Sequence, residues 1–163
     1  MLTSILDQPP MIQFHIATAL VAVVLAPVIL LRRRGDRLHR WLGYLWIAAM
    51  GLTALSSFQV FTLRLIGPFS PIHLLSIFTL WALQRALRAA RAGRIAVHRQ
   101  AMSSLVIGLT VAGLFTLFPG RFMSKLLFGP AQTEGFAAAL VLSLAAGGWL
   151  LWRHRRLQPG AGG

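Results

Sequence analysis

The stretch GDRLHRWLGYLW, residues Gly35–Trp46, marks the point at which a charged segment of the chain becomes an apolar one. His39 and Arg40 stand side by side at this boundary. The same pair returns as His98 and Arg99 in GRIAVHRQAM, again before an apolar segment. Because each apolar segment is long enough to cross a bilayer as a helix, each His-Arg pair is predicted to mark the place where a helix enters a membrane.

The composition assigns the chain to the membrane proteins. Of its 163 residues, 56% are hydrophobic, 12% are charged and only three are acidic, whereas a soluble domain carries about 25% charged residues. The mean hydropathy is +0.70. The chain has no cysteine, which excludes disulfides, thiolate metal sites and cysteine nucleophiles. The net charge of +13 comes from short arginine runs between apolar segments, so we expect no nucleic-acid partner.

The apolar segments predict an all-α integral membrane protein, a single domain over residues 1–163 with five transmembrane helices. The stretch between the last two segments is bracketed by Pro119 and Pro130 and is too apolar for a solvated loop, so it is expected to lie at the membrane interface. The expected helices span about residues 11–31, 41–63, 71–91, 100–118 and 136–152, and a tail follows at 153–163.

The basic residues predict the orientation. Thirteen of the sixteen lie in the first loop, around the third segment or in the tail, which alternate along the chain. By the positive-inside rule the N-terminus is expected outside the cell and the C-terminus in the cytoplasm. The N-terminal stretch has no basic n-region and no small-residue cleavage signal, so the first helix is expected to be retained. The lipid bilayer is the expected partner.

Four histidines recur with a regular spacing. His15 and His73 lie near the outer starts of the first and third helices, and His39 and His98 lie at the inner starts of the second and fourth. The spacing from His15 to His39 is 24 residues and that from His73 to His98 is 25. This pattern predicts one helical hairpin used twice, which would form a four-helix core with the fifth helix at its periphery. The two outer histidines lie nearly the same number of residues from the cytoplasmic ends of their helices. At about 1.5 Å of rise per residue, they are therefore expected at the same depth in the membrane.

Paired histidines at one depth on facing helices are the arrangement that a bis-histidine haem b requires. The expected axial ligands of the iron are His15 with His73 at the outer level and His39 with His98 at the inner level. Two such levels would form an electron path between the membrane faces, with a quinone or another redox partner. The metal centre expected from the sequence is therefore haem iron.

Small residues lie on the helix faces of these histidines, namely Ala19, Ala22 and Ala26 after His15 and Gly43 after His39. They leave room either for a flat cofactor or for a closely packed helix. Aromatic residues near the inner boundary are expected to form an interfacial belt. They are Trp41, Tyr44, Trp46, Trp149 and Trp152.

An interpretation without a cofactor agrees equally well with these residues. The histidines would then hold neighbouring helices together by hydrogen bonds, in a structural, assembly or small-molecule-handling membrane protein. The fifth histidine, His154, is read as a tail residue, and Asp36 is expected to pair with loop arginines. No pair of carboxylates is placed for acid or base chemistry, and no glycine-rich nucleotide loop is visible. Whether the protein is an enzyme stays open.

The segments HRWLG at His39–Gly43, FHIATALVAVVLAPV in the first helix and HRQAM in the fourth resemble a family of bacterial multi-pass membrane proteins that is a domain of unknown function. The resemblance covers about residues 11–117. After His98 the stretch QAMSSL departs from the tryptophan and arginine expected in that family. More distantly, the layout of four histidines on four helices is similar to that of the diheme cytochrome b membrane reductases, which implies haem-linked electron transfer.

Overall fold

The computed structural model describes residues 4–59 and 71–156, and every regular element within these ranges is a helix. The chain divides into two compact units, which meet in sequence between Leu109 and Thr110. The elements are the short 3-10 helix η1 (Ile5–Asp7) and the α-helices α1 (Pro10–Leu31), α2 (Arg37–Ser57), α3 (Pro71–Arg91), α4 (Ile95–Thr116), α5 (Phe122–Phe128) and α6 (Gln132–Arg156).

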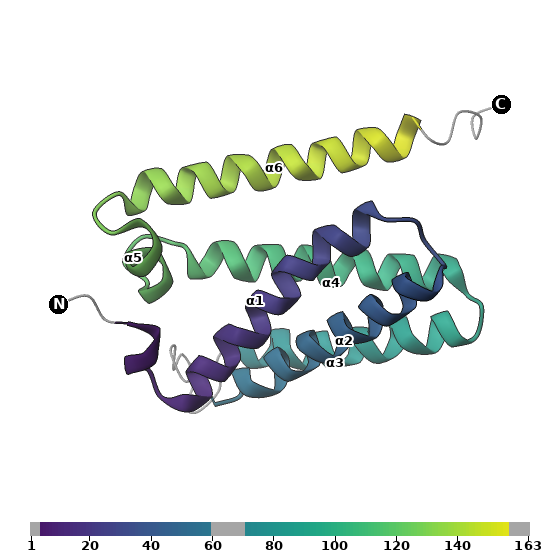
Figure 1. The fold of residues 1–163 in the computed structure, drawn as a ribbon, viewed down its shortest axis with the longest axis horizontal. Coiled ribbons are helices and arrows are strands. Elements are labelled where there is room, and N and C mark those ends of the chain that lie inside the picture. The colour runs from purple at the N-terminus through teal and green to yellow at the C-terminus, as the bar shows by residue number, and fades with distance from the viewer. Residues whose placement is uncertain (1–3, 60–70, 157–163) are drawn as a thin grey trace. The chain divides into compact units, whose positions relative to one another are not determined.

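In the first unit α1 crosses α2, and α2 runs beside α3 (Figure 1). One buried cluster joins these three helices to the first half of α4. Six of its members are alanines, which let helix backbones approach closely where lipid offers no hydrophobic drive for association. The cluster comprises Ala22, Ala26, Ile29, Trp46, Ala49, Met50, Ala82, Leu83, Ala86, Ala101 and Leu105. Ala22 and Ala26 therefore serve helix packing.

Trp46 is the largest fully buried side chain of this cluster, with 1% of its surface exposed. Its indole Nε1–H donates a hydrogen bond of 2.9 Å to the Ala22 carbonyl on α1. The expectation that Trp46 belongs to an interfacial belt is therefore wrong. The bond to Ala22 explains the difference, because a buried indole needs one acceptor and the adjacent helix supplies it. The other belt residues, such as Trp41 at 70% and Tyr44 at 48%, are exposed.

The connection between α1 and α2 sets the start of α2 at Arg37, four residues before the predicted start. Asp36 caps the helix by accepting from the His39 backbone N–H at 2.6 Å, and its other oxygen pairs with Arg32 at 2.6 Å. The backbone at Gly35 has a φ of 86°, a value that residues with a Cβ rarely adopt. The predicted pairing of Asp36 with a loop arginine is confirmed.

The connection between α3 and α4 has three residues, 92–94, and is shorter than the five-residue connection between α1 and α2. Gly93, at a φ of 69°, ends α3 in a Schellman motif, in which the Arg94 N–H donates to the Ala89 carbonyl at 2.9 Å and the Gly93 N–H donates to the Ala90 carbonyl at 3.2 Å. The next helix therefore begins at Ile95, not near residue 100 as predicted. The observed α3 has the predicted bounds.

The second unit holds α5 and α6, which pack against each other. Phe118 meets Phe136 edge to face at 5.4 Å, and the Gly120 N–H donates to the Gln132 side-chain carbonyl at 2.8 Å. Gly135 lets the Phe128 ring approach, since a Cβ at this position would lie 2.3 Å from that ring. The stretch predicted to be interfacial thus contains a short helix, α5.

Three helices of the described residues are long and apolar enough to cross a membrane: α1, α4 and residues 132–150 of α6. The prediction of five transmembrane helices is therefore confirmed only in part. The arginines near the start of α2 and in the last turns of α3 lower the hydropathy of these two helices. The predicted second span reached residue 63, and its last residues, 60–63, lie outside the described residues.

Candidate functional site: histidines at the two ends of the first unit

His15 contacts the last turn of α2. Its Nδ1 lies 3.0 Å from the Ser56 hydroxyl oxygen, which itself donates to the Thr53 carbonyl at 3.0 Å. Because a hydroxyl has a single proton, Ser56 must accept from the imidazole, and His15 carries its proton on Nδ1. The Nε2 lone pair of His15 is therefore available to an acid, a donor or a metal.

His73 reaches the same turn of α2 from the first turn of α3. Its side chain is 6% exposed, and its ring stacks on the Phe58 ring with 5.6 Å between centroids and 13° between planes. One turn further along α3, the Ser76 hydroxyl forms a buried hydrogen bond with the Ser57 hydroxyl. The start of α3 is thus joined to the end of α2 by a ring stack and a hydroxyl pair.

Two adjacent serines organise this end of the unit. Ser56 faces α1 through His15, and Ser57 faces α3 through Ser76. His15 and His73 therefore both lie at the last turn of α2, and their ligation of one iron stays a prediction. The sequence reading missed the two serines, although polar residues at the end of an apolar segment, as in LTALSSF, are a signal for inward-facing contacts.

At the opposite end of α2 lies His39. Its Nδ1 is buried and has no hydrogen-bond partner in the structure. A buried ring nitrogen without a partner costs free energy, because it has lost its hydrogen bond to water. Gly43 lies one turn further along α2, and a Cβ there would meet no atom within 4 Å. There is open space beside this turn of α2.

His98, in the first turn of α4, contacts α3. Its Nδ1 lies 3.0 Å from the Ala86 carbonyl oxygen. A carbonyl can only accept, so His98 also carries its proton on Nδ1 and leaves its Nε2 lone pair available. His15 and His98, one at each end of the first unit, therefore share the tautomer that metal-binding histidines adopt when Nε2 is the ligand atom.

The surroundings of His39 lower the pKa of its imidazole. His39 precedes the apolar part of α2, and burial lowers the pKa of its imidazole. When protonated, His98 lowers the pKa of His39 further, while Asp36 opposes the shift. His39 is therefore neutral at physiological pH, which is the form that binds a metal. The pKa of Asp36 is also lowered, first by the bond from the His39 N–H and then by Arg32.

Within residues 4–59 and 71–156, no three histidine, cysteine or acidic side chains gather in a group that could hold a metal ion. A bis-histidine haem needs only two protein ligands. The predicted pairs, His15 with His73 and His39 with His98, are therefore not tested by this search.

A family model described as "Predicted membrane protein (DUF2306)" matches residues 12–152. The chain belongs to this family. Searches of the curated proteins and of the solved structures each returned no match. Membership of DUF2306 confirms the resemblance to a family of membrane proteins of unknown function. The likeness to diheme cytochrome b reductases, by contrast, stays a prediction.

Proposed function

We propose that this DUF2306 protein transfers electrons across the membrane through two b-type haems, each held between two histidines. His15 and His73 would ligate one iron, and His39 and His98 the other. The observations that carry the proposal are the 3.0 Å contacts of the His15 Nδ1 with the Ser56 hydroxyl and of the His98 Nδ1 with the Ala86 carbonyl, in which we infer that each Nδ1–H donates. A ligand histidine almost always donates its second nitrogen in this way, which fixes the ring and strengthens the ligand atom.

Two features of the His39 end support a fit to haem. The Nδ1 of His39 is buried without a partner, and burial keeps this imidazole neutral. The open space at Gly43 lies on the same face of α2, one turn from His39. A flat macrocycle needs both a neutral nitrogen ligand and a gap in the packing beside it.

The residues of the chain would do the following. Ser56 holds the His15 ring, and Phe58 covers a face of the His73 ring. The alanine-rich core keeps water away from the path between the two ends. A bound haem b would supply a one-electron couple. A quinone or a redox protein would exchange electrons at the membrane faces.

The visible absorption spectrum tests the proposal. The protein is expressed with added haem precursor, purified in mild detergent, and measured oxidised and after dithionite reduction. We expect a Soret band that shifts on reduction, with the sharp visible bands of low-spin six-coordinate haem. A colourless protein with the far-ultraviolet circular dichroism of a helical fold would contradict the proposal.

A second candidate function has its own support. The same hydrogen bonds of His15 and His98, with the stack of His73 on Phe58, join neighbouring helices without any cofactor. In this reading the protein has a structural, assembly or small-molecule-handling role. Each histidine substitution would then cost about 1 kcal/mol of stability, as for a hydrogen bond inside a membrane, and no Soret band would exist.

We also propose that the chain lies in the bacterial inner membrane with its C-terminus in the cytoplasm. The test uses single cysteines, which suit a chain that has none of its own. The two positions chosen are Ala92, between α3 and α4, and Thr133, at the start of α6, and both residues are exposed. Gly93 is not substituted, because a residue with a Cβ would be strained at its positive φ. An impermeant thiol reagent on intact spheroplasts is expected to label Thr133→Cys but not Ala92→Cys, which should react only after permeabilisation. The reverse pattern would invert the orientation.

A further inference from the structure

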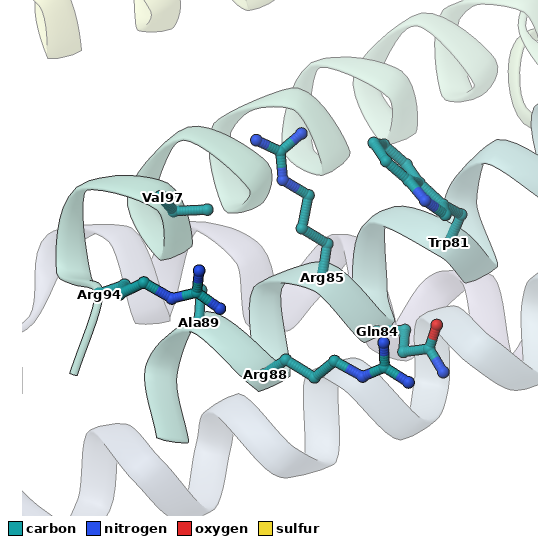
Figure 2. Close-up of a pocket in the computed structure, with 7 residues that line it drawn as sticks. All are labelled: Trp81, Gln84, Arg85, Arg88, Ala89, Arg94 and Val97. Carbon is teal, nitrogen blue, oxygen red and sulfur yellow. The ribbon is translucent and has the colours of Figure 1, made fainter. Parts of the chain in front are cut away.

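The second half of α3 and the start of α4 line a cationic cavity of about 340 Å³. Arg85, Arg88 and Arg94 line it together with Trp81 and Gln84. Figure 2 shows Arg94 extending from the start of α4 over Ala89, and Arg88 extending along α3 towards Gln84. Three guanidinium groups and a side-chain amide thus line one space, with two of the cations on the last turns of α3 and the third at the start of α4.

Within the described residues of the first unit, no carboxylate forms an ion pair with these three arginines. The whole sequence has three acidic residues. Asp7 caps η1, Asp36 pairs with Arg32, and Glu134 lies in the first turn of α6. The cavity also lies at the N-terminal turn of α4, where the helix dipole adds partial positive charge. Like charges held close together without counter-charge favour an anionic ligand.

Arginine is suited to one class of anion in particular. Its planar fork of N–H donors matches the oxygens of a phosphate group, and two or three arginines around one space allow several charge-assisted hydrogen bonds. The Arg85 guanidinium lies 5.4 Å from the centre of the Trp81 ring, a cation–π contact that orients one of the three forks.

The face of α3 that leads to the cavity is apolar. Leu74, Ile77, Phe78 and Trp81 are exposed by 72%, 55%, 45% and 52%. At 100° per residue these side chains lie on the same side of the helix as Arg85 and Arg88. An exposed apolar strip that ends in arginines matches an acyl chain joined to a phosphate, whereas a soluble phosphate would have no use for the strip.

We propose that the cavity lined by Arg85, Arg88 and Arg94 binds the phosphate of an anionic phospholipid whose acyl chain lies along Leu74, Phe78 and Trp81. The arginines bind the headgroup, and Trp81 lies where the headgroup meets the chain. This site does not depend on the histidines or on haem. The site gives these three arginines a specific ligand, in addition to the part that they play in the predicted topology.

Native mass spectrometry of the detergent-purified chain tests the proposal. The protein is titrated with dioleoyl phosphatidylglycerol, dioleoyl phosphatidylcholine, dihexanoyl phosphatidylglycerol and inorganic phosphate. We expect dioleoyl phosphatidylglycerol to bind most tightly, because it alone offers both an anionic headgroup and long chains. Replacing Arg85, Arg88 and Arg94 together with glutamine should weaken its binding at least about tenfold, since all three cations that attract the anionic headgroup are removed.

The matched control replaces Arg153, Arg155 and Arg156 with glutamine, which removes the same charge from the end of the chain. This variant should bind dioleoyl phosphatidylglycerol like the wild type. A second triple variant with lysine keeps the charge and the fold, and it should bind more weakly than the wild type because it loses the forks. Equal losses in the cavity and control variants would overturn the proposal. Inorganic phosphate binding as tightly as the lipid would overturn the lipid assignment and leave a soluble phosphate as the ligand.

Discussion

Replacing His15 or His73 with alanine is expected to convert the same haem from low-spin to high-spin or to remove it, with about half of the low-spin signal lost in each case. Both substitutions remove one ligand of one iron, so the double variant should lose little more than either single variant. His39→Ala and His98→Ala should act together in the same way on the second haem. The measurement is the haem content per chain and the low-spin electron paramagnetic resonance signal.

The matched control is His154→Ala, which removes a histidine near the end of α6 that the proposal does not use. Its spectrum should equal that of the wild type. Additive losses for His15 and His73 would mean that they serve different sites, which would contradict their pairing. Ser56→Ala offers a finer test, because it removes the hydrogen bond to the His15 Nδ1 but leaves the ligand atom. It should retain haem and shift its reduction potential.

Replacing Trp46 with alanine should lower the free energy of unfolding of the first unit by about 3–5 kcal/mol, the usual cost of deleting a buried aromatic side chain. Trp46 is 1% exposed and donates to the Ala22 carbonyl, so the change opens a cavity and also removes a link between α1 and α2. Trp46→Phe keeps most of the volume and should cost about 1 kcal/mol for the lost bond. The measurement is unfolding by a denaturing detergent, followed by circular dichroism.

Trp41→Ala is the control for this prediction, since Trp41 is 70% exposed and lies on the same helix. It should change the unfolding free energy by less than about 0.5 kcal/mol. Equal losses at the two positions would show that the packing of α2 on α1 does not depend on the indole of Trp46. None of these outcomes depends on whether haem is bound.

The positions of most helices follow from the sequence because their boundaries are local features. Pro71 opens α3, arginines follow its apolar part, and Gly93 ends it, so the predicted and observed bounds agree. The start of α2 was predicted too late because the apolar segment begins at Trp41, whereas the capping carboxylate is Asp36. Capping depends on the backbone and is not visible in hydropathy, so the arginine-rich first turn of α2 was read as loop.

The sequence by itself determined that this is a helical membrane protein, that histidines recur at the helix ends and that Asp36 pairs with an arginine, because composition, spacing and short-range contacts are written along the chain. Only the tertiary structure decided that Trp46 is buried against Ala22, that Ser56 and Ser57 face different helices, and that three arginines share one cavity. The physical reason is that lipid and protein interior are equally apolar. Hydropathy therefore cannot distinguish the face of a helix that contacts lipid from the face that contacts another helix.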